Sequence, residues 1–81
     1  MSEFIFSVAT TVEEITGRHD IEASQELIKS GIIDSFGILQ LILEIEQQHG
    51  ISLENEDLDA TNFSSIQTIS DLVAKKQTQK N

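Results

Sequence analysis

The sequence predicts an all-α domain, a small bundle of three main helices plus one short helix. Apolar residues recur at helical spacing in three segments, and no segment shows the apolar–polar alternation of a strand. Proline is absent, and three of the four glycines stand where a helical pattern stops. We expect one domain over residues 1–77, followed by a polar tail at 78–81.

The first helix is predicted over residues 3–16. Glu3 would lie in its first turn, where the helix dipole favours an anion, and Gly17 would end it. A single apolar stripe along this segment is formed by Phe4, Val8, Val12 and Ile15. This stripe predicts that one face of the helix packs on the core.

Residues 18–33 have no sustained period and predict a long loop, with at most one helical turn after Ser24. Apolar residues are scattered through it, and we expect the loop to pack them on the core: Ile21, Leu27, Ile28, Ile32 and Ile33. A loop of this length in a compact domain is often functional.

The second helix is the clearest element, with Asp34 as its N-cap and Gly50 as its end. Its apolar residues cover more than half of the helix circumference: Phe36, Ile38, Leu39, Leu41, Ile42, Leu43 and Ile45. The remaining arc is predicted to hold Gly37, Gln40, Glu44, Gln47 and Gln48. The helix is therefore either central in the bundle or leaves apolar surface for something else to cover.

The C-terminal third predicts an acidic turn at residues 51–59, a short helix at residues 60–64 that buries Phe63, and a last helix at residues 66–76. Ser65 is the expected cap of that last helix. Its predicted buried residues are Ile66, Ile69, Leu72 and Val73.

Composition narrows the classes of function. Fourteen acidic residues against five basic ones give a formal net charge of −9, which repels nucleic acid and anionic lipid and attracts basic partners. The absence of cysteine excludes disulfides and thiolate zinc sites and suits the cytoplasm. No apolar run approaches the roughly 20 residues of a membrane span. A chain of 81 residues is short for a catalytic cleft, so we do not expect an enzyme.

The stretch Gly31-Ile-Ile-Asp34-Ser35-Phe36 places one hydroxyl at the first position of the main helix, directly after the long loop. The free N–H groups and positive dipole end of a helix N-terminus suit a phosphodiester attached to Ser35. An isolated Asp-Ser pair, however, usually does no more than cap a helix.

The wider pattern favours the functional interpretation. The run DSFGILQLILEIEQQHGISL resembles the modification helix of acyl carrier proteins and of the related peptidyl and D-alanyl carriers. The shared motif is an Asp-Ser pair with a following apolar residue, then a helix that ends in a Gly-apolar turn, here Gly50-Ile51. The resemblance extends to Leu27 and Gly31 in the preceding loop and to the run that begins at Phe63.

This resemblance implies that Ser35 accepts 4′-phosphopantetheine from coenzyme A through a separate phosphopantetheinyl transferase, with Asp34 as the adjacent cap. The protein would be a monomeric cytoplasmic carrier of acyl or aminoacyl thioesters, and not a catalyst. It would dock on the transferase, on a loading ligase and on downstream synthase enzymes. The implied docking residues are Phe36, Leu39, Leu43, Glu46 and Gln47.

Three positions depart from the pattern of fatty-acid carriers. Gly37 and Gln40 replace residues that are usually acidic, and Phe36 replaces a commoner Leu, which makes the run more similar to D-alanyl and aminoacyl carriers. The bulky residues Phe36, Leu39, Ile42, Leu43 and Ile45 also predict a closed wall that admits no long alkyl chain. We therefore expect an aminoacyl or short acyl cargo.

Three rival interpretations remain. A hydrolase could pair Ser35 with His19 or His49, although the chain lacks the G-x-S-x-G turn. Residues 54–59 could bind calcium, although they lack the EF-hand spacing, and a solvated acidic loop explains them better. The third is an unmodified helical adaptor that binds a partner through the second helix.

Overall fold

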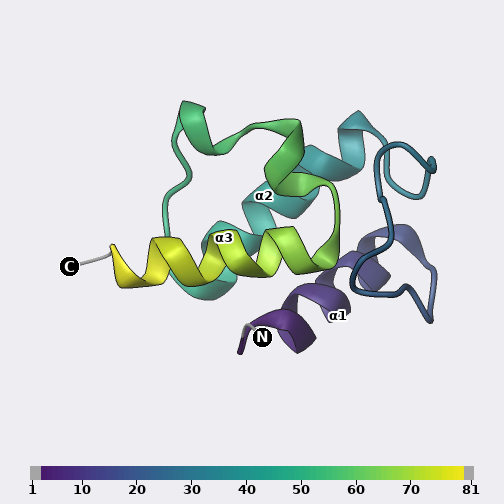
Figure 1. The fold of residues 1–81 in the computed structure, drawn as a ribbon, viewed down its shortest axis with the longest axis horizontal. Coiled ribbons are helices and arrows are strands. Elements are labelled where there is room, and N and C mark those ends of the chain that lie inside the picture. Colours follow the sequence, from purple (N-terminus) through teal and green to yellow (C-terminus); the bar gives the residue numbers. More distant parts are fainter. Residues whose placement is uncertain (1–2, 80–81) are drawn as a thin grey trace.

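The computed structural model of the protein describes residues 3–79 as a bundle of three α-helices and two short 3₁₀ helices. In chain order these are α1 (Ile5–Thr16), α2 (Ser35–His49), η1 (Asn55–Asp57), η2 (Ala60–Phe63) and α3 (Ile66–Thr78). Residues 3–79 contain no strand, and the predicted all-α bundle is confirmed. Figure 1 shows α1 and α3 packed against α2, with the long loop between α1 and α2 at one end of the bundle.

One apolar core joins the three helices, the long loop and η2. Its side chains are almost completely buried: Val8, Val12, Leu27, Ile33, Leu41, Ile45, Ile51, Phe63, Ile66, Ile69, Leu72 and Val73. Burial of this apolar surface is the main force that holds so small a domain together. No helix within residues 3–79 is long and apolar enough to cross a membrane.

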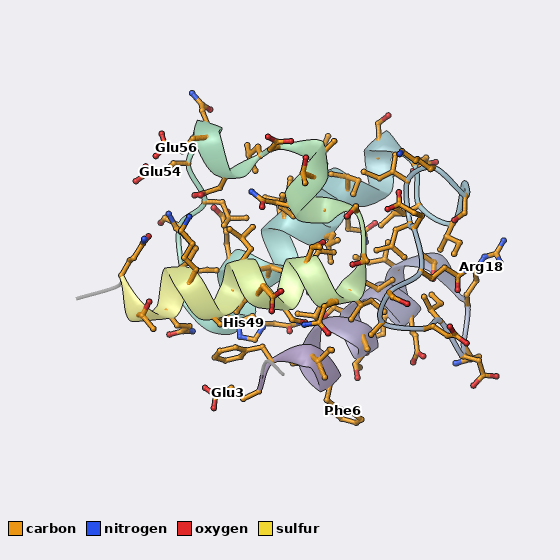
Figure 2. All side chains as sticks on the ribbon, viewed as in Figure 1. Glu3, Phe6, Arg18, His49, Glu54 and Glu56 are labelled. Atoms are coloured by element: carbon orange, nitrogen blue, oxygen red, sulfur yellow. The ribbon has the colours of Figure 1, made fainter. Side chains whose placement is uncertain are left out.

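Helix α1 begins at Ile5, two residues later than predicted, so Glu3 precedes the helix and does not lie in its first turn. The predicted end is correct, because Gly17 closes the helix through its N–H, which donates to the Glu13 carbonyl oxygen at 2.8 Å. The apolar stripe faces the core as expected, with Val8 and Val12 fully buried. Figure 2 shows Phe6 on the opposite side, pointing away from the bundle.

The loop at residues 17–34 contains turns and no helix, so the helical turn suggested after Ser24 is absent. Backbone hydrogen bonds within the loop and to the start of α3 hold it in place. The Leu27 N–H donates to the Ser64 carbonyl at 2.7 Å, and the Ile33 N–H donates to the Leu27 carbonyl at 3.1 Å. The Ala23 carbonyl accepts the Gln67 N–H at 2.9 Å, which satisfies one of the open donors at the start of α3. The loop is thereby fixed to the far end of the chain.

Helix α2 has the predicted bounds, and Gly50 ends it with φ +63°, a conformation that favours glycine. Two assignments made from the helical wheel are wrong. Gly37, placed on the polar arc, is buried, whereas Phe36, Leu39 and Leu43, placed on an inward wall, are 75%, 62% and 66% exposed. Of the two alternatives for this helix, the structure shows the second, in which apolar surface is left uncovered.

Helix α3 begins at Ile66 as predicted and continues to Thr78, two residues past the expected end. Ser65 caps it, since its Oγ accepts the Thr68 N–H at 3.2 Å while its own N–H donates to the Thr68 hydroxyl. The predicted tail at 78–81 begins inside the helix at Thr78, and its last two positions lie outside the described residues. The four predicted core residues of α3 are all buried.

His49 ends α2 and contacts the start of α1 and Gln77 near the end of α3. The Phe4 and His49 rings meet edge to face with their centroids 5.3 Å apart, and the Ser7 Oγ lies 3.3 Å from the His49 Nε2. The Gln77 Nε2 donates to the His49 carbonyl at 2.7 Å. Partial burial lowers the pKa of His49, since removal from water disfavours the charged ring. Figure 2 shows His49 between α3 and the start of α1.

This burial predicts an acid-sensitive junction. A histidine whose folded-state pKa lies below its unfolded value, near 6.5, binds protons more readily when the chain unfolds, so stability falls as the pH drops below that value. When the pH is lowered from 7 to 5, the free energy of unfolding of His49→Phe should therefore fall less than that of the wild type. Urea titrations at the two pH values measure this difference. His19→Gln, at an exposed loop position, is the matched control and should follow the wild type. Equal losses of stability in all three proteins would show that His49 does not cause the acid sensitivity.

Candidate functional site

The start of α2 is a capped helix terminus that presents Ser35 to solvent. The Asp34 Oδ1 accepts the Gly37 N–H at 2.9 Å, and the Asp34 carbonyl accepts the Ile38 N–H at 2.9 Å, which closes the first helical turn. Asp34 is extended, with φ −104° and ψ −176°, as expected of an N-cap residue. Ser35, the next residue, is exposed on this ordered first turn.

The loop before Ser35 approaches α2 closely because position 37 has no side chain. A Cβ at Gly37 would lie 2.7 Å from Ile33 Cγ1 and 3.4 Å from Asp34 Oδ1. Ile33 is itself buried, so it has little freedom to move aside. Gly31 adopts φ +80°, a conformation that favours glycine, and turns the chain into this approach. The close packing of Ile33 thus explains why position 37 is a glycine and not the acidic residue that is usual in fatty-acid carriers.

The exposed apolar residues of α2 form a stripe along one side of the helix. Phe36, Leu39 and Leu43 recur three to four residues apart and lie near the exposed Gln47. Glu46, predicted beside them as a docking residue, is half-buried, and its Oε2 accepts the Leu53 N–H at 2.9 Å. The structure therefore brings four of the five predicted docking residues to the surface and gives the Glu46 carboxylate a structural partner.

An apolar groove of about 350 Å³ runs beside α2 on the side that faces η1 and η2. Its lining residues are Ile28, Ile38, Leu39, Ile42, Leu58, Asp59, Ala60 and Phe63. Three of these follow Ser35 by three, four and seven residues, so Ser35 lies on the helix face that borders the groove. A group attached to the Ser35 hydroxyl can extend along this face.

A second hollow, of about 380 Å³, lies on the other side of the start of α2. It is bounded by the end of α1, by the loop at residues 31–34 and by Phe36, Gly37 and Gln40. On the helix circumference these three positions lie about 100° or more from Ser35. Of the two hollows, the apolar groove is the one in line with the Ser35 side chain.

A nearly buried ion pair that the sequence analysis missed involves Asp57, the residue before the groove residue Leu58. Asp57, expected in a solvated acidic loop, is 5% exposed, and its Oδ2 lies 2.8 Å from the Lys76 Nζ and accepts the Glu54 N–H at 2.8 Å. The hydrogen bond from Glu54 and the ammonium of Lys76 lower the pKa of Asp57. The spacing Glu54-x-x-Asp57, a capping box, could have indicated the bond between Asp57 and the Glu54 N–H, but it does not identify Lys76 as a partner.

Within residues 3–79, no histidine is hydrogen-bonded to Ser35. His49 is separated from Ser35 by the length of α2, about 21 Å at 1.5 Å per residue, and it contacts Ser7 instead. Within residues 3–79 there is no cluster of three or more His, Asp or Glu side chains that could hold a metal ion. Figure 2 shows Glu54 and Glu56 at the outer edge of the fold, while Asp57 of the same turn is engaged by Lys76.

Comparison with known proteins identifies the family to which the chain belongs. The profile of the family described as "Phosphopantetheine attachment site" matches residues 7–74, most of the chain. The chain belongs to this family. It is a carrier protein, and the group that the family carries covalently is 4′-phosphopantetheine. The resemblance inferred from the sequence is confirmed.

Individual relatives of this carrier protein belong to two groups. It is 36% identical over 55 residues to a D-alanyl carrier protein of Enterococcus faecalis, an alignment that covers 65% of this chain and 70% of the relative. It is 28% identical over 74 residues to the meromycolate extension acyl carrier protein of Mycobacterium bovis, covering 89% of this chain and 60% of the relative. A D-alanyl carrier protein of Lacticaseibacillus casei is 27% identical over 60 residues, covering 72% of this chain and 74% of the relative.

The site of this carrier protein suits such an arm. An exposed primary hydroxyl can accept a phosphodiester, and the free N–H groups of a helix N-terminus stabilise its negative charge. The groove beside the Ser35 face offers an apolar surface along which an arm can lie. The residues present therefore fit 4′-phosphopantetheine.

Proposed function

We propose that this protein carries an aminoacyl or short acyl group on a 4′-phosphopantetheine arm bound to Ser35. The observation that carries the proposal is the exposure of Ser35 on the ordered, capped first turn of α2. When bound, the arm supplies a thiol that holds the cargo as a thioester. The chain itself supplies the attachment point, the docking surface and the groove, and we expect it to be a substrate and not an enzyme.

Each group at the start of α2 has a defined task in this proposal. In the transfer from coenzyme A, the Ser35 Oγ forms the new bond to phosphorus, the bond from phosphorus to the nucleotide breaks, and a separate transferase removes the hydroxyl proton. Asp34 keeps the first turn ordered through the Gly37 N–H. The positive end of the α2 dipole favours the phosphodiester formed.

The exposed stripe of Phe36, Leu39, Leu43 and Gln47 is the surface that we expect partner enzymes to cover. Apolar side chains this exposed in a small domain are typical of interaction sites. The net charge of −9 would steer basic partners to it. The expected partners are a phosphopantetheinyl transferase, a loading ligase and downstream synthase enzymes, met by a monomer in the cytoplasm, where coenzyme A is available.

The cargo class rests on the relatives and on the packing below the groove. Two of the relatives named above are D-alanyl carriers, and Gly37 and Gln40 depart from the acidic pattern of fatty-acid carriers. Because Phe36, Leu39 and Leu43 are exposed, they do not form the closed wall that we expected from the sequence. The core below the groove, however, is closely packed. Phe63, Leu41 and Ile45 are at most 2% exposed, and Phe63 closes the floor of the groove.

Attachment is tested by mass spectrometry. Incubation with coenzyme A and a broad-specificity transferase should add one arm to the wild type and none to Ser35→Ala, because this variant lacks the acceptor oxygen. Ser30→Ala, at the nearest other exposed serine of the preceding loop, should be modified like the wild type. Modification of Ser35→Ala would overturn the assignment, and an unmodified wild type would favour the adaptor interpretation.

The cargo class is tested by loading the arm with either D-alanyl or octanoyl. We expect the two loaded forms to give similar amide chemical shifts at Ile45 and Ile69, because the closed core resists added volume. Changes should be confined to the groove, for example at Ile38. Octanoyl-specific shifts at both core residues, together with a higher melting temperature, would show that a long chain enters the bundle and would contradict the proposed cargo.

A further inference from the structure

The two walls of the apolar groove belong to different packing units. Ile38, Leu39 and Ile42 are fixed in α2, whereas Leu58 and Asp59 lie between η1 and η2, and Ala60 begins η2. The η2 helix packs mainly on α3 and not on α2. The width of the groove therefore depends on how firmly the η1–η2 segment, residues 55–63, is fastened to α3.

Two features fasten the segment: the burial of Phe63 in the core and the polar contacts of Asp57. The Asp57 carboxylate binds the Lys76 ammonium on α3, and its backbone carbonyl accepts the Asn62 Nδ2 at 2.9 Å, which ties η1 to η2. The side chains of Asp57 and Lys76 are only 7% and 12% exposed, so water screens the pair weakly. Leu58, which follows Asp57 directly, is part of the groove wall.

A long alkyl chain could enter if this segment moved outward. Apart from Ile28 of the long loop, every lining residue outside α2 belongs to this segment, which ends at the buried Phe63. Outward movement of that wall would separate Asp57 from Lys76 and leave both charges without their partner. Such separation is costly when the charges are poorly hydrated.

We propose that Asp57 and Lys76 form a latch that keeps the groove narrow and so restricts the cargo on the Ser35 arm to short groups. This inference rests on the proposed function, because it assumes an arm at Ser35. It assigns Asp57 and Lys76 as positioning residues: they act through the place of the η1–η2 segment and do not touch the cargo.

The test compares the hydrolysis of two thioesters on the Ser35 arm, acetyl and octanoyl, in the wild type and in latch variants. Lys76→Met keeps the length of the side chain and removes its charge. Asp57→Asn keeps an oxygen for the Glu54 N–H and weakens the pair more gently, and it serves if Lys76→Met does not fold. Lys75→Met removes the neighbouring exposed charge and is the matched control. Intact mass first confirms that every protein carries the arm at Ser35, so a failure of attachment is distinguished from a failure of the latch.

In the wild type and in Lys75→Met, the octanoyl thioester should hydrolyse about as fast as the acetyl thioester. In the latch variants, octanoyl hydrolysis should become about threefold slower because the opened groove shields the chain from water, while acetyl hydrolysis stays unchanged. If the pair of Asp57 and Lys76 had only a structural role, the latch variants would have a different melting temperature, but the change in hydrolysis rate would not depend on the length of the acyl chain. Octanoyl lifetimes that are equal in all variants, a wild type that already protects octanoyl, or equal changes for both thioesters would overturn the proposal.

Discussion

The hydrogen bond from the Gly37 N–H to the Asp34 carboxylate fixes the point at which the long loop becomes α2. That point determines the first turn of the helix, and therefore the direction of Ser35 and of the groove residues that follow it. Without the Asp34 carboxylate, the Gly37 N–H would lose its partner, and the first turn would fray. This hydrogen bond contributes little free energy, but the positions of Ser35 and of the groove residues of α2 depend on it.

The loop can hold Asp34 in place because it is fastened to the other end of the chain. The Leu27 and Ala23 backbone groups bind Ser64 and Gln67 at the start of α3, and the Leu27 and Ile33 side chains are buried in the core. Ile33 then packs against Gly37 at a distance that admits no Cβ. The start of α2 is thus positioned by the same core that stabilises the fold, which explains how so short a chain presents an ordered candidate site.

The sequence predicted the elements that carry local signals. The cap at Asp34, the helix end at Gly50 and the cap at Ser65 all follow from short patterns, and the structure has each of them. Ser35 was identified as the candidate attachment point through the motif around it. The bounds of α2 were also predicted correctly, so the spacing of its exposed stripe could be taken from the sequence.

The features that the sequence did not reveal depend on contacts between distant segments. A helical wheel gives the angle between Phe36 and Gly37, but the packing of the loop decides which of them is buried. Asp57 and Lys76 are 19 positions apart, and nothing local pairs a lysine of α3 with one of several acidic residues of the turn. The half-burial of Glu46 follows from its bond to Leu53, which only the fold reveals.

The most direct test of the central claim is the initial rate of 4′-phosphopantetheine transfer to Asp34→Asn and Asp34→Ala. Asparagine keeps an oxygen that can accept the Gly37 N–H, so Asp34→Asn should retain most of the wild-type rate. Alanine removes the cap, worth about 0.5–2 kcal/mol, and Asp34→Ala should slow the transfer by about tenfold. An equal loss in both variants would assign the role of Asp34 to its charge, and an unchanged rate in Asp34→Ala would show that the transferase needs no ordered first turn. Either result would contradict the account.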